Sequence, residues 1–221
     1  MFLRGFRIPG LAFAGDRFYP SRLVTQPIGE QAVSHNTVAE NQRRHRLDDD
    51  EQRWLFGYGS LIYLVDFPYL ESRPASIRGW SRRFWQGSHD HRGTELNPGR
   101  VVTLIEDPDA VCGGLAYLIE APVFRQLDER EKNGYLRVAT EMTFADGSQA
   151  NGLTYIATPA NEAYLGAASE SDIARHICGA AGPSGPNDEY LLQLAEALRR
   201  LGQHDRHVFN IESHILKIKR Q

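Results

Sequence analysis

The sequence has 221 residues and a formal net charge of −3 at pH 7. This length suits one domain, or one domain with a tail, and allows a core without disulfides or metals. The near-neutral charge does not predict a nucleic-acid or anionic-membrane partner, and no segment approaches the roughly 20 apolar residues of a membrane span. Cys112 and Cys178 stand far apart, which favours buried thiols in a reducing cytoplasm over a disulfide framework.

Residues 1–51 differ from the rest of the chain. Short apolar pieces, turn formers and charged runs follow one another there without a helical or strand period. The segment is therefore predicted to be an N-terminal extension without regular structure. Up to Gly29 it carries four arginines and one acid, as an organellar targeting peptide, a mis-assigned start or a solvated tail would. We expect the folded domain to span residues 52–221.

From residue 54 onward, short apolar runs bounded by Gly, Pro and Asp predict β-strands. They cover residues 54–56, 77–85, 101–105, 115–119, 138–144 and 153–157. The runs at 101–105 and 115–119 suit strands that are buried on both faces. Asp146-Gly147 separates the last two strands and favours a hairpin turn between them.

Helical segments lie between and after these strands. Pro122 begins a helix that Gly134 would close as a left-handed cap. Ser169-x-x-Asp172 resembles a capping box that starts a second helix, to about residue 180. An apolar stripe over 191–201 predicts a third helix, and an amphipathic stretch ending near Ile218 predicts a fourth. The pattern indicates a mixed α/β (α+β) domain with five or six short strands, forming a small closed sheet with helices outside.

The helix that begins at Pro122 carries the first candidate for chemistry. At 100° per residue, Phe124, Leu127 and Glu131 share one narrow sector, so Glu131 should face the core, while Asp128 at its edge could reach solvent. Burial raises the pKa of a carboxyl group, and such groups often serve as general bases. A structural ion pair with an arginine is the alternative.

The turn Phe56-Gly57-Tyr58-Gly59-Ser60-Leu61-Ile62 is the second candidate. Two glycines at the end of a strand permit positive φ and leave backbone N–H groups uncovered, which can bind a carboxylate or an oxyanion. The spacing fits neither a nucleophile elbow nor a P-loop. An ordinary tight turn is the alternative.

Arginines, a hydroxyl, an acid and two histidines surround aromatic residues in the third candidate, residues 82–93. His89-x-His91 could offer two metal ligands, but no third ligand clusters with them, so we predict no metal site. Arginines that bind a substrate carboxylate are the more economical interpretation. A solvated charged loop is the alternative.

These segments occur together, in order, with several others. They are Phe-Gly-Tyr-Gly-Ser-Leu-Ile at 56–62, Ser-Arg-Arg-Phe-Trp-Gln-Gly-Ser at 81–88, Asp-His-Arg-Gly at 90–93, Pro-Gly-Arg-Val-Val-Thr-Leu at 98–104, Arg-Glu-Lys-x-Gly-Tyr at 130–135, Tyr-Leu-Gly at 164–166 and Ala-Ala-Gly-Pro-Ser-Gly at 180–185. On these blocks, from about residue 54 to the last helix, the sequence resembles the ChaC-type, glutathione-specific γ-glutamylcyclotransferases.

The resemblance implies a γ-glutamylcyclotransferase-like fold, a small β-barrel with surrounding helices, and an enzyme that cleaves glutathione to 5-oxoproline and cysteinylglycine without a cofactor. It places the catalytic glutamate at Glu131, as general base and acid. It places substrate binding at Gly57, Tyr58, Gly59, Ser60, Leu61, Ile62, Arg83, Ser88 and Tyr135.

Some positions depart from the family pattern. His89, Asn133, Tyr63 and Pro186 replace a threonine, a glycine, a tryptophan and an arginine, and Leu136 stands between Tyr135 and the next arginine. These changes bear on turnover and on the grip on the Cys-Gly half, because Glu131 and the turn are retained. Two alternatives stay open: a cyclotransferase for another γ-glutamyl amine, and a non-catalytic γ-glutamyl or glutathione binder.

Overall fold

A computed structural model describes residues 36–221, and its centre is a closed five-stranded barrel with strand order β1-β3-β2-β4-β5. The strands are β1 (Gln52–Gly57), β2 (Glu71–Ser88), β3 (Gly99–Glu120), β4 (Tyr135–Phe144) and β5 (Gln149–Ala157), with a 3-10 turn η1 (Ser60–Ile62) after β1. The pairs are antiparallel except β1 with β5. The predicted α+β barrel is confirmed.

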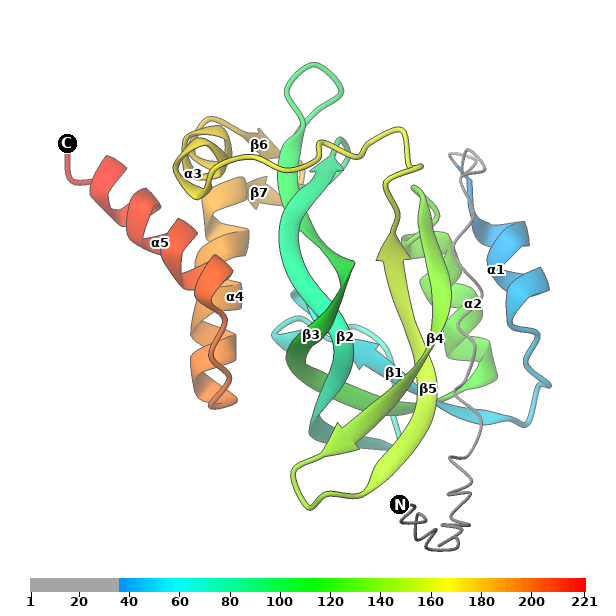
Figure 1. Cartoon of the computed structure of the whole chain (residues 1–221). Helices are drawn as coiled ribbons and strands as arrows, with labels where there is room; N and C mark the ends of the chain where they lie inside the picture. The colour runs from blue at the N-terminus through cyan, green and yellow to red at the C-terminus, as the bar shows by residue number, and fades with distance from the viewer. Residues whose placement is uncertain (1–35) are drawn as a thin grey trace, which may run out of the picture.

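Helices cover the barrel on two sides (Figure 1). They are α1 (Val38–Arg44), α2 (Ala121–Arg130), α3 (Glu170–Cys178), α4 (Asn187–Arg200) and α5 (Arg206–Ile218), with a two-stranded ribbon of β6 (Ala181–Gly182) and β7 (Gly185–Pro186). Helices α3, α4 and α5 lie on one side of the barrel, and α1 and α2 on the other. Among the described helices, none combines the length and apolar character needed to cross a bilayer.

One long strand, β3, replaces the two strands predicted at 101–105 and 115–119. The pairing of β3 with β2 jumps from Arg78↔Val111 to Trp80↔Glu106, opposite Gly79, whose φ is +81°. Residues 107–110 therefore bulge out of the ladder. Pro108, which cannot donate to a neighbouring strand, lies in this bulge, so the charged stretch bends the strand without ending it.

The helix ends follow the predictions in part. Ser169 caps α3, since its hydroxyl accepts from the backbone N–H of Asp172 at 3.1 Å. The Asp146-Gly147 hairpin joins β4 to β5, with Gly147 at φ +82°. The predicted end of α2 at Gly134 is wrong, because the helix stops at Arg130 with Glu131 as its C-cap. Gly134 has φ +90° in the following loop, where a Cβ would collide with Asn161.

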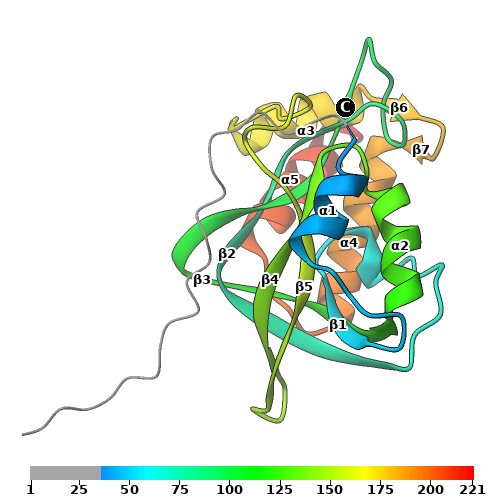
Figure 2. The ribbon, with the colours of Figure 1, turned by 90° about the vertical axis from the view of Figure 1, so that its right-hand side faces the viewer.

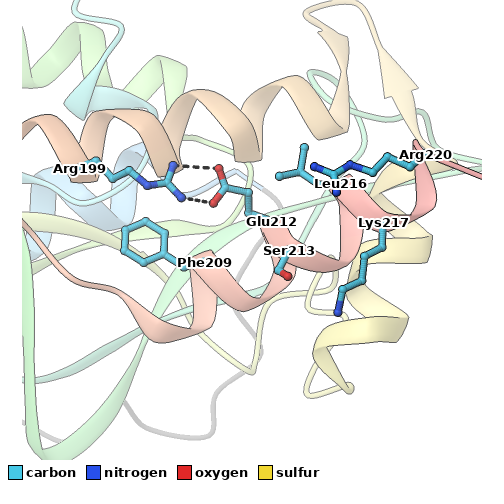
Figure 3. Close-up of a pocket in the computed structure, with 7 residues that line it drawn as sticks. All are labelled: Arg199, Phe209, Glu212, Ser213, Leu216, Lys217 and Arg220. Carbon is cyan, nitrogen blue, oxygen red and sulfur yellow. Dashed lines mark hydrogen bonds and ion pairs between the residues drawn. The ribbon is translucent and has the colours of Figure 1, made fainter.

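The apolar stripe of α4 packs into the core, with Leu191, Leu194 and Leu198 fully buried. On the outside, α4 and α5 are joined beside a surface hollow (Figure 3). The guanidinium of Arg199 pairs with both carboxylate oxygens of Glu212 and lies 4.6 Å from the ring centroid of Phe209. These contacts fix α4 from its solvent side.

Residues 1–35 lie outside the described residues. The possible targeting peptide, which would end near Gly29, lies within them. In residues 36–51 the structure differs from the expectation of no regular structure, because α1 forms there. A helix of seven residues has too little length to show a period. Its stability comes from tertiary contacts, as the full burial of Asn41 indicates.

Candidate active site

A cavity opens between the β1–η1 turn, the loop after α2, and side chains from β3, β5 and α4. Its lining residues are Phe56, Gly57, Tyr58, Gly59, Ser60, Leu61, Val102, Glu131, Tyr135, Tyr155 and Tyr190. Five segments far apart in the sequence thus meet around one carboxylate and four phenols. Such a convergence of titratable groups in a concave site is typical of an active site.

Glu131 lies at the C-cap of α2, where its backbone N–H donates to the Leu127 carbonyl at 2.8 Å. Its side chain is 21% exposed, and Arg130 Nε lies 3.4 Å from Oε1. Burial raises the pKa of Glu131 from 4.5 to about 6; Arg130 opposes this rise, and the charges of Asp90 and Asp66 add to it. The carboxylate is therefore ionised at neutral pH and still basic enough to take a proton.

The turn that lines the cavity leaves three backbone donors without an acceptor in the described part of the chain. The N–H groups of Gly59, Ser60 and Leu61 donate to no acceptor within residues 36–221. Gly57 and Gly59, which could have adopted positive φ, do not do so. Glycine is required there by close approach, because a Cβ on Gly57 would lie 2.8 Å from Leu61 Cβ, and one on Gly59 2.9 Å from Val102 Cγ2.

Side chains of the barrel hold the carbonyl groups of this turn. Arg82 Nε donates to the Tyr58 carbonyl at 2.6 Å. Thr154 Oγ1 donates to the Phe56 carbonyl at 3.0 Å, and Tyr117 Oη to the Leu61 carbonyl at 2.6 Å. The carbonyls of Tyr58, Gly59 and Ser60 share peptide planes with the N–H groups of the residues that follow them, Gly59, Ser60 and Leu61. Arg82 binds the first of these carbonyls, and the N–H groups of Ile62 and Tyr63 bind the other two at 3.0 Å. These bonds orient the three free donors, which is the preorganisation that anion binding requires.

Four tyrosines complete the lining. Tyr58 Oη donates to the Tyr155 carbonyl at 2.7 Å, and Tyr135 Oη to the Val102 carbonyl at 3.3 Å. Burial raises the pKa of both Tyr58 and Tyr135 well above 10. They are therefore neutral at physiological pH, and they line the cavity with Glu131 without adding charge.

The sequence suggested that Asp128 could reach solvent, but in the structure it is fully buried. Its carboxylate pairs with Arg137 Nη2 at 2.6 Å and Nε at 2.8 Å, and accepts from Tyr155 Oη at 2.8 Å. The buried guanidinium of Arg137 on β4 needs a counter-ion, and Asp128 supplies it from α2. This pair fixes Tyr155, one wall of the cavity.

Three residues predicted to bind substrate lie away from the cavity. Ile62 packs in the hydrophobic core, and its N–H donates to the Gly59 carbonyl. Arg83 donates to the Arg82 carbonyl at 2.8 Å and lines a separate hollow beside α5. Ser88 Oγ accepts from the backbone N–H of Arg92 at 3.0 Å. The block 81–88 therefore supports the site mainly through Arg82.

Sequence reasoning missed Val102, Tyr155 and Tyr190 as lining residues, and it included Phe56 in the candidate turn without naming it as a substrate-binding residue. Tyr155 is two residues from Leu153 on a predicted strand and so shares its face. Tyr190 directly precedes the apolar stripe that begins at Leu191. Both positions therefore carried a weak signal of burial. Nothing local showed that they would meet at Glu131. No group of three or more His, Cys, Asp or Glu side chains that could hold a metal ion occurs in the part of the chain that the structure describes.

The chain is similar to known proteins along most of its length. A family model described as ChaC-like protein matches residues 53–218. The chain is 44% identical to human glutathione-specific gamma-glutamylcyclotransferase 1, over 71% of this chain and 75% of that protein. It is also 44% identical to gamma-glutamylcyclotransferase 2-3 of Arabidopsis thaliana, over 75% and 89%.

Among solved structures, a yeast γ-glutamyl cyclotransferase specific to glutathione superposes with a TM-score of 0.71. The two are 32% identical, and the match covers 76% of this chain and 97% of the yeast chain. The family predicted from the sequence motifs is confirmed: this chain belongs to the ChaC-like family.

Proposed function

We propose that the protein cleaves glutathione to 5-oxoproline and cysteinylglycine, with Glu131 as the proton acceptor and donor. The observation that carries this proposal is the position of Glu131, which lines one cavity with Gly59, Ser60 and Leu61, whose N–H groups have no acceptor within residues 36–221. Relatives in vertebrates and yeasts that are named glutathione-specific gamma-glutamylcyclotransferases support the choice of substrate.

The reaction is an intramolecular transfer. The α-amine of the γ-glutamyl group attacks its own δ-carbonyl carbon, a C–N bond forms in a five-membered ring, and the bond to the cysteine nitrogen breaks. Both reacting groups belong to one molecule, so the enzyme mainly holds a near-attack conformation, which can be worth roughly 7–11 kcal/mol. The reaction as written involves no metal or redox cofactor.

Glu131 would act as proton acceptor for the attacking amine and as proton donor to the leaving cysteine nitrogen. An α-ammonium group in peptides has a pKa of about 7.7–8.0, and the pKa of Glu131 is raised to about 6 by burial. A gap of roughly two pKa units lets the carboxylate take a proton from the α-ammonium group before the neutral amine attacks, and the protonated Glu131 can then give that proton to the departing amide nitrogen. The N–H groups of the turn would bind the substrate α-carboxylate or the developing oxyanion.

Two other functions use the same cavity. A cyclotransferase for a different γ-glutamyl amine would have the same Glu131 and the same turn. A non-catalytic glutathione binder would not need an inward carboxylate with a raised pKa, and this feature favours the enzyme. A cytoplasmic location and the absence of nucleic-acid and membrane partners remain predictions from the sequence.

The test is to incubate the full chain with glutathione and, separately, with a panel of γ-glutamyl amino acids, and to measure 5-oxoproline by chromatography. We expect 5-oxoproline and cysteinylglycine in equal amounts from glutathione. Turnover of another γ-glutamyl compound in place of glutathione would move the substrate assignment. Binding of glutathione without any 5-oxoproline would support the non-catalytic binder.

A further inference from the structure

The segment from Asn36 to His45, which we call the N-terminal strap, precedes the part of the chain that the ChaC-like model matches, residues 53–218. It contains α1, which lies beside α2 in both views of the ribbon (Figures 1 and 2). Its polar side chains Thr37 and Asn41 are 1% and 0% exposed. Polar groups buried to this degree need specific partners.

Thr37 binds the loop that carries Glu131. Its backbone N–H donates to the Lys132 carbonyl at 3.0 Å, and its Oγ1 donates to the same carbonyl at 3.1 Å. The neighbouring residue Asn36 forms an isolated β-bridge with Asn133. The strap thus binds the loop between α2 and β4 directly after Glu131, while Asp90 and Asn161 bind the same loop at Asn133.

Asn41 continues this contact along the start of β4. Its Nδ2 donates to the Tyr135 carbonyl at 3.0 Å, and its Oδ1 accepts from the Arg137 N–H at 2.7 Å. The carboxamide therefore bonds a carbonyl and an N–H two residues apart on one strand, as the peptide group of a neighbouring strand would. Tyr135, whose ring lines the cavity, is held at its backbone by this side chain.

The strap also reaches the pair that fixes Tyr155. The His45 carbonyl accepts from Arg137 Nη1 at 3.0 Å. The same guanidinium binds Asp128, which in turn accepts from Tyr155 Oη. The strap thus contacts three parts of the cavity lining. It binds Tyr135 directly, it binds the residue after Glu131, and it reaches Tyr155 through the Arg137–Asp128 pair.

We propose that the N-terminal strap positions Glu131 and Tyr135 for catalysis, with Thr37 and Asn41 as the positioning residues. Glu131 follows the last residue of α2, so the helix alone does not fix its loop. The strap binds this loop at Lys132 and Tyr135, from a segment outside the matched family domain. This inference rests on the proposed function, because it concerns the group that takes the proton.

The experiment uses the full chain and the variants Asn41→Ala, Thr37→Val and Thr37→Ser. Valine keeps the shape of threonine and the backbone N–H but removes the hydroxyl donor, whereas serine keeps the donor. We expect kcat for glutathione to fall about tenfold or more in Asn41→Ala, with KM within about threefold of wild type. Thr37→Val should lose severalfold in kcat, and Thr37→Ser should keep the wild-type value.

Glu40→Gln is the matched control. Glu40 lies in the same helix and pairs with Arg43 and Arg44, also of α1, so its kcat should stay at the wild-type value. Circular dichroism and thermal unfolding correct each rate for the folded fraction. If Asn41→Ala fails to fold, the Thr37→Val and Thr37→Ser pair carries the test. The proposed positioning role of the strap would be overturned if folded Thr37→Val and Asn41→Ala kept the wild-type kcat. It would also be overturned if Glu40→Gln lost as much kcat as these variants.

Hydrogen exchange separates this inference from the proposed function. If the wild-type chain releases no 5-oxoproline from glutathione, the proposed function fails. Hydrogen exchange at the amides of residues 132–137 still measures whether the strap orders the loop. Faster exchange there in Asn41→Ala, with unchanged exchange in Glu40→Gln, would support a strap that orders the loop. Equal exchange in the wild type and both variants would overturn it.

Discussion

The two halves of the cavity are held in place by different parts of the chain. The turn from Gly57 to Ile62 takes its constraints from buried barrel side chains, Arg82, Tyr117 and Thr154, all inside the matched family domain. The loop from Glu131 to Tyr135 is bound by Asp90 and Asn161 inside that domain and also by Thr37 and Asn41, which lie before it. The half that we propose to bind the anion is thus built into the barrel, and the half that we propose to transfer the proton is also bound by the strap.

This difference has a consequence for the stability of each half. A buried charged side chain such as Arg82 cannot be removed without leaving partners unpaired in the core. The neutral hydrogen bonds of the strap each contribute roughly 0.5–1.5 kcal/mol. We therefore expect damage to the turn to affect folding and damage to the strap to affect turnover.

Replacing Arg82 should have the largest effect on stability. Arg82 is 2% exposed and donates to the carbonyls of Tyr58 and Gly113 and to Asp205, the N-cap of α5. Arg82→Met should lower the free energy of unfolding by about 3–5 kcal/mol, because it leaves a carboxylate and two carbonyls without their donors. Urea unfolding measures this loss.

Arg78→Met is the control for that change. Arg78 lies on the same strand, β2, but its side chain is exposed, and the free energy of unfolding should change by less than about 0.5 kcal/mol. Similar losses in the two variants would show that Arg82 does not anchor the turn, and the contrast between the two halves would then disappear.

The Glu131→Gln substitution should stabilise the protein at alkaline pH. Burial raises the pKa of Glu131 to about 6 from 4.5, so between these values the folded state keeps a proton that the unfolded chain releases. The free energy of unfolding therefore falls as the pH rises through this window, and above it the buried charge costs about 2 kcal/mol.

Glutamine carries no such charge. Unfolding at pH 8 should show Glu131→Gln more stable than the wild type by about 2 kcal/mol, and the difference should vanish by about pH 4. A variant that is less stable at pH 8 would mean that the ionised carboxylate helps to hold its loop, which would weaken the account of a loop held by the strap, Asp90 and Asn161.

Gly147→Ala should show the smallest effect on the cavity. Gly147 has φ +82° in the hairpin between β4 and β5, and a Cβ there would contact nothing within 4 Å. Alanine in the left-handed region should cost about 1–2 kcal/mol of stability, with kcat and KM for glutathione unchanged. Altered kinetics would show that general loosening of the barrel, rather than the local anchors, controls the site.

Much of the fold could be predicted from the sequence because its signals are local. The hairpin at Asp146-Gly147 and the cap at Ser169 depend on neighbouring residues only, and both occur in the structure. The continuity of β3 through Pro108 could not be predicted, since it depends on a bulge opposite Gly79. The end of α2 was missed because tertiary contacts of residues 131–134 replace helical ones.

The candidate site divides in the same way. Helix periodicity predicted that Glu131 faces inward, although the helix ends one residue before it, and the turn is marked by its two glycines. The placement of Tyr155 and Tyr190 in the same cavity requires the closed barrel and the packing of α4. The role of Asp128 required Arg137, nine residues along the chain and on another element. The helix α1 and its contacts with the site could not be predicted, because seven residues are too few to show a helical hydrophobic period.

The most direct test of the account compares 5-oxoproline release from glutathione by the wild type, Glu131→Gln and Glu129→Gln. Glu129 is an exposed neighbour on the same helix and controls for the loss of one carboxylate. Each variant's binding of glutathione is measured by calorimetry. We predict that Glu131→Gln binds glutathione but releases 5-oxoproline about 10²–10⁴-fold more slowly, while Glu129→Gln matches the wild type. Release by Glu131→Gln at the wild-type rate would contradict the account.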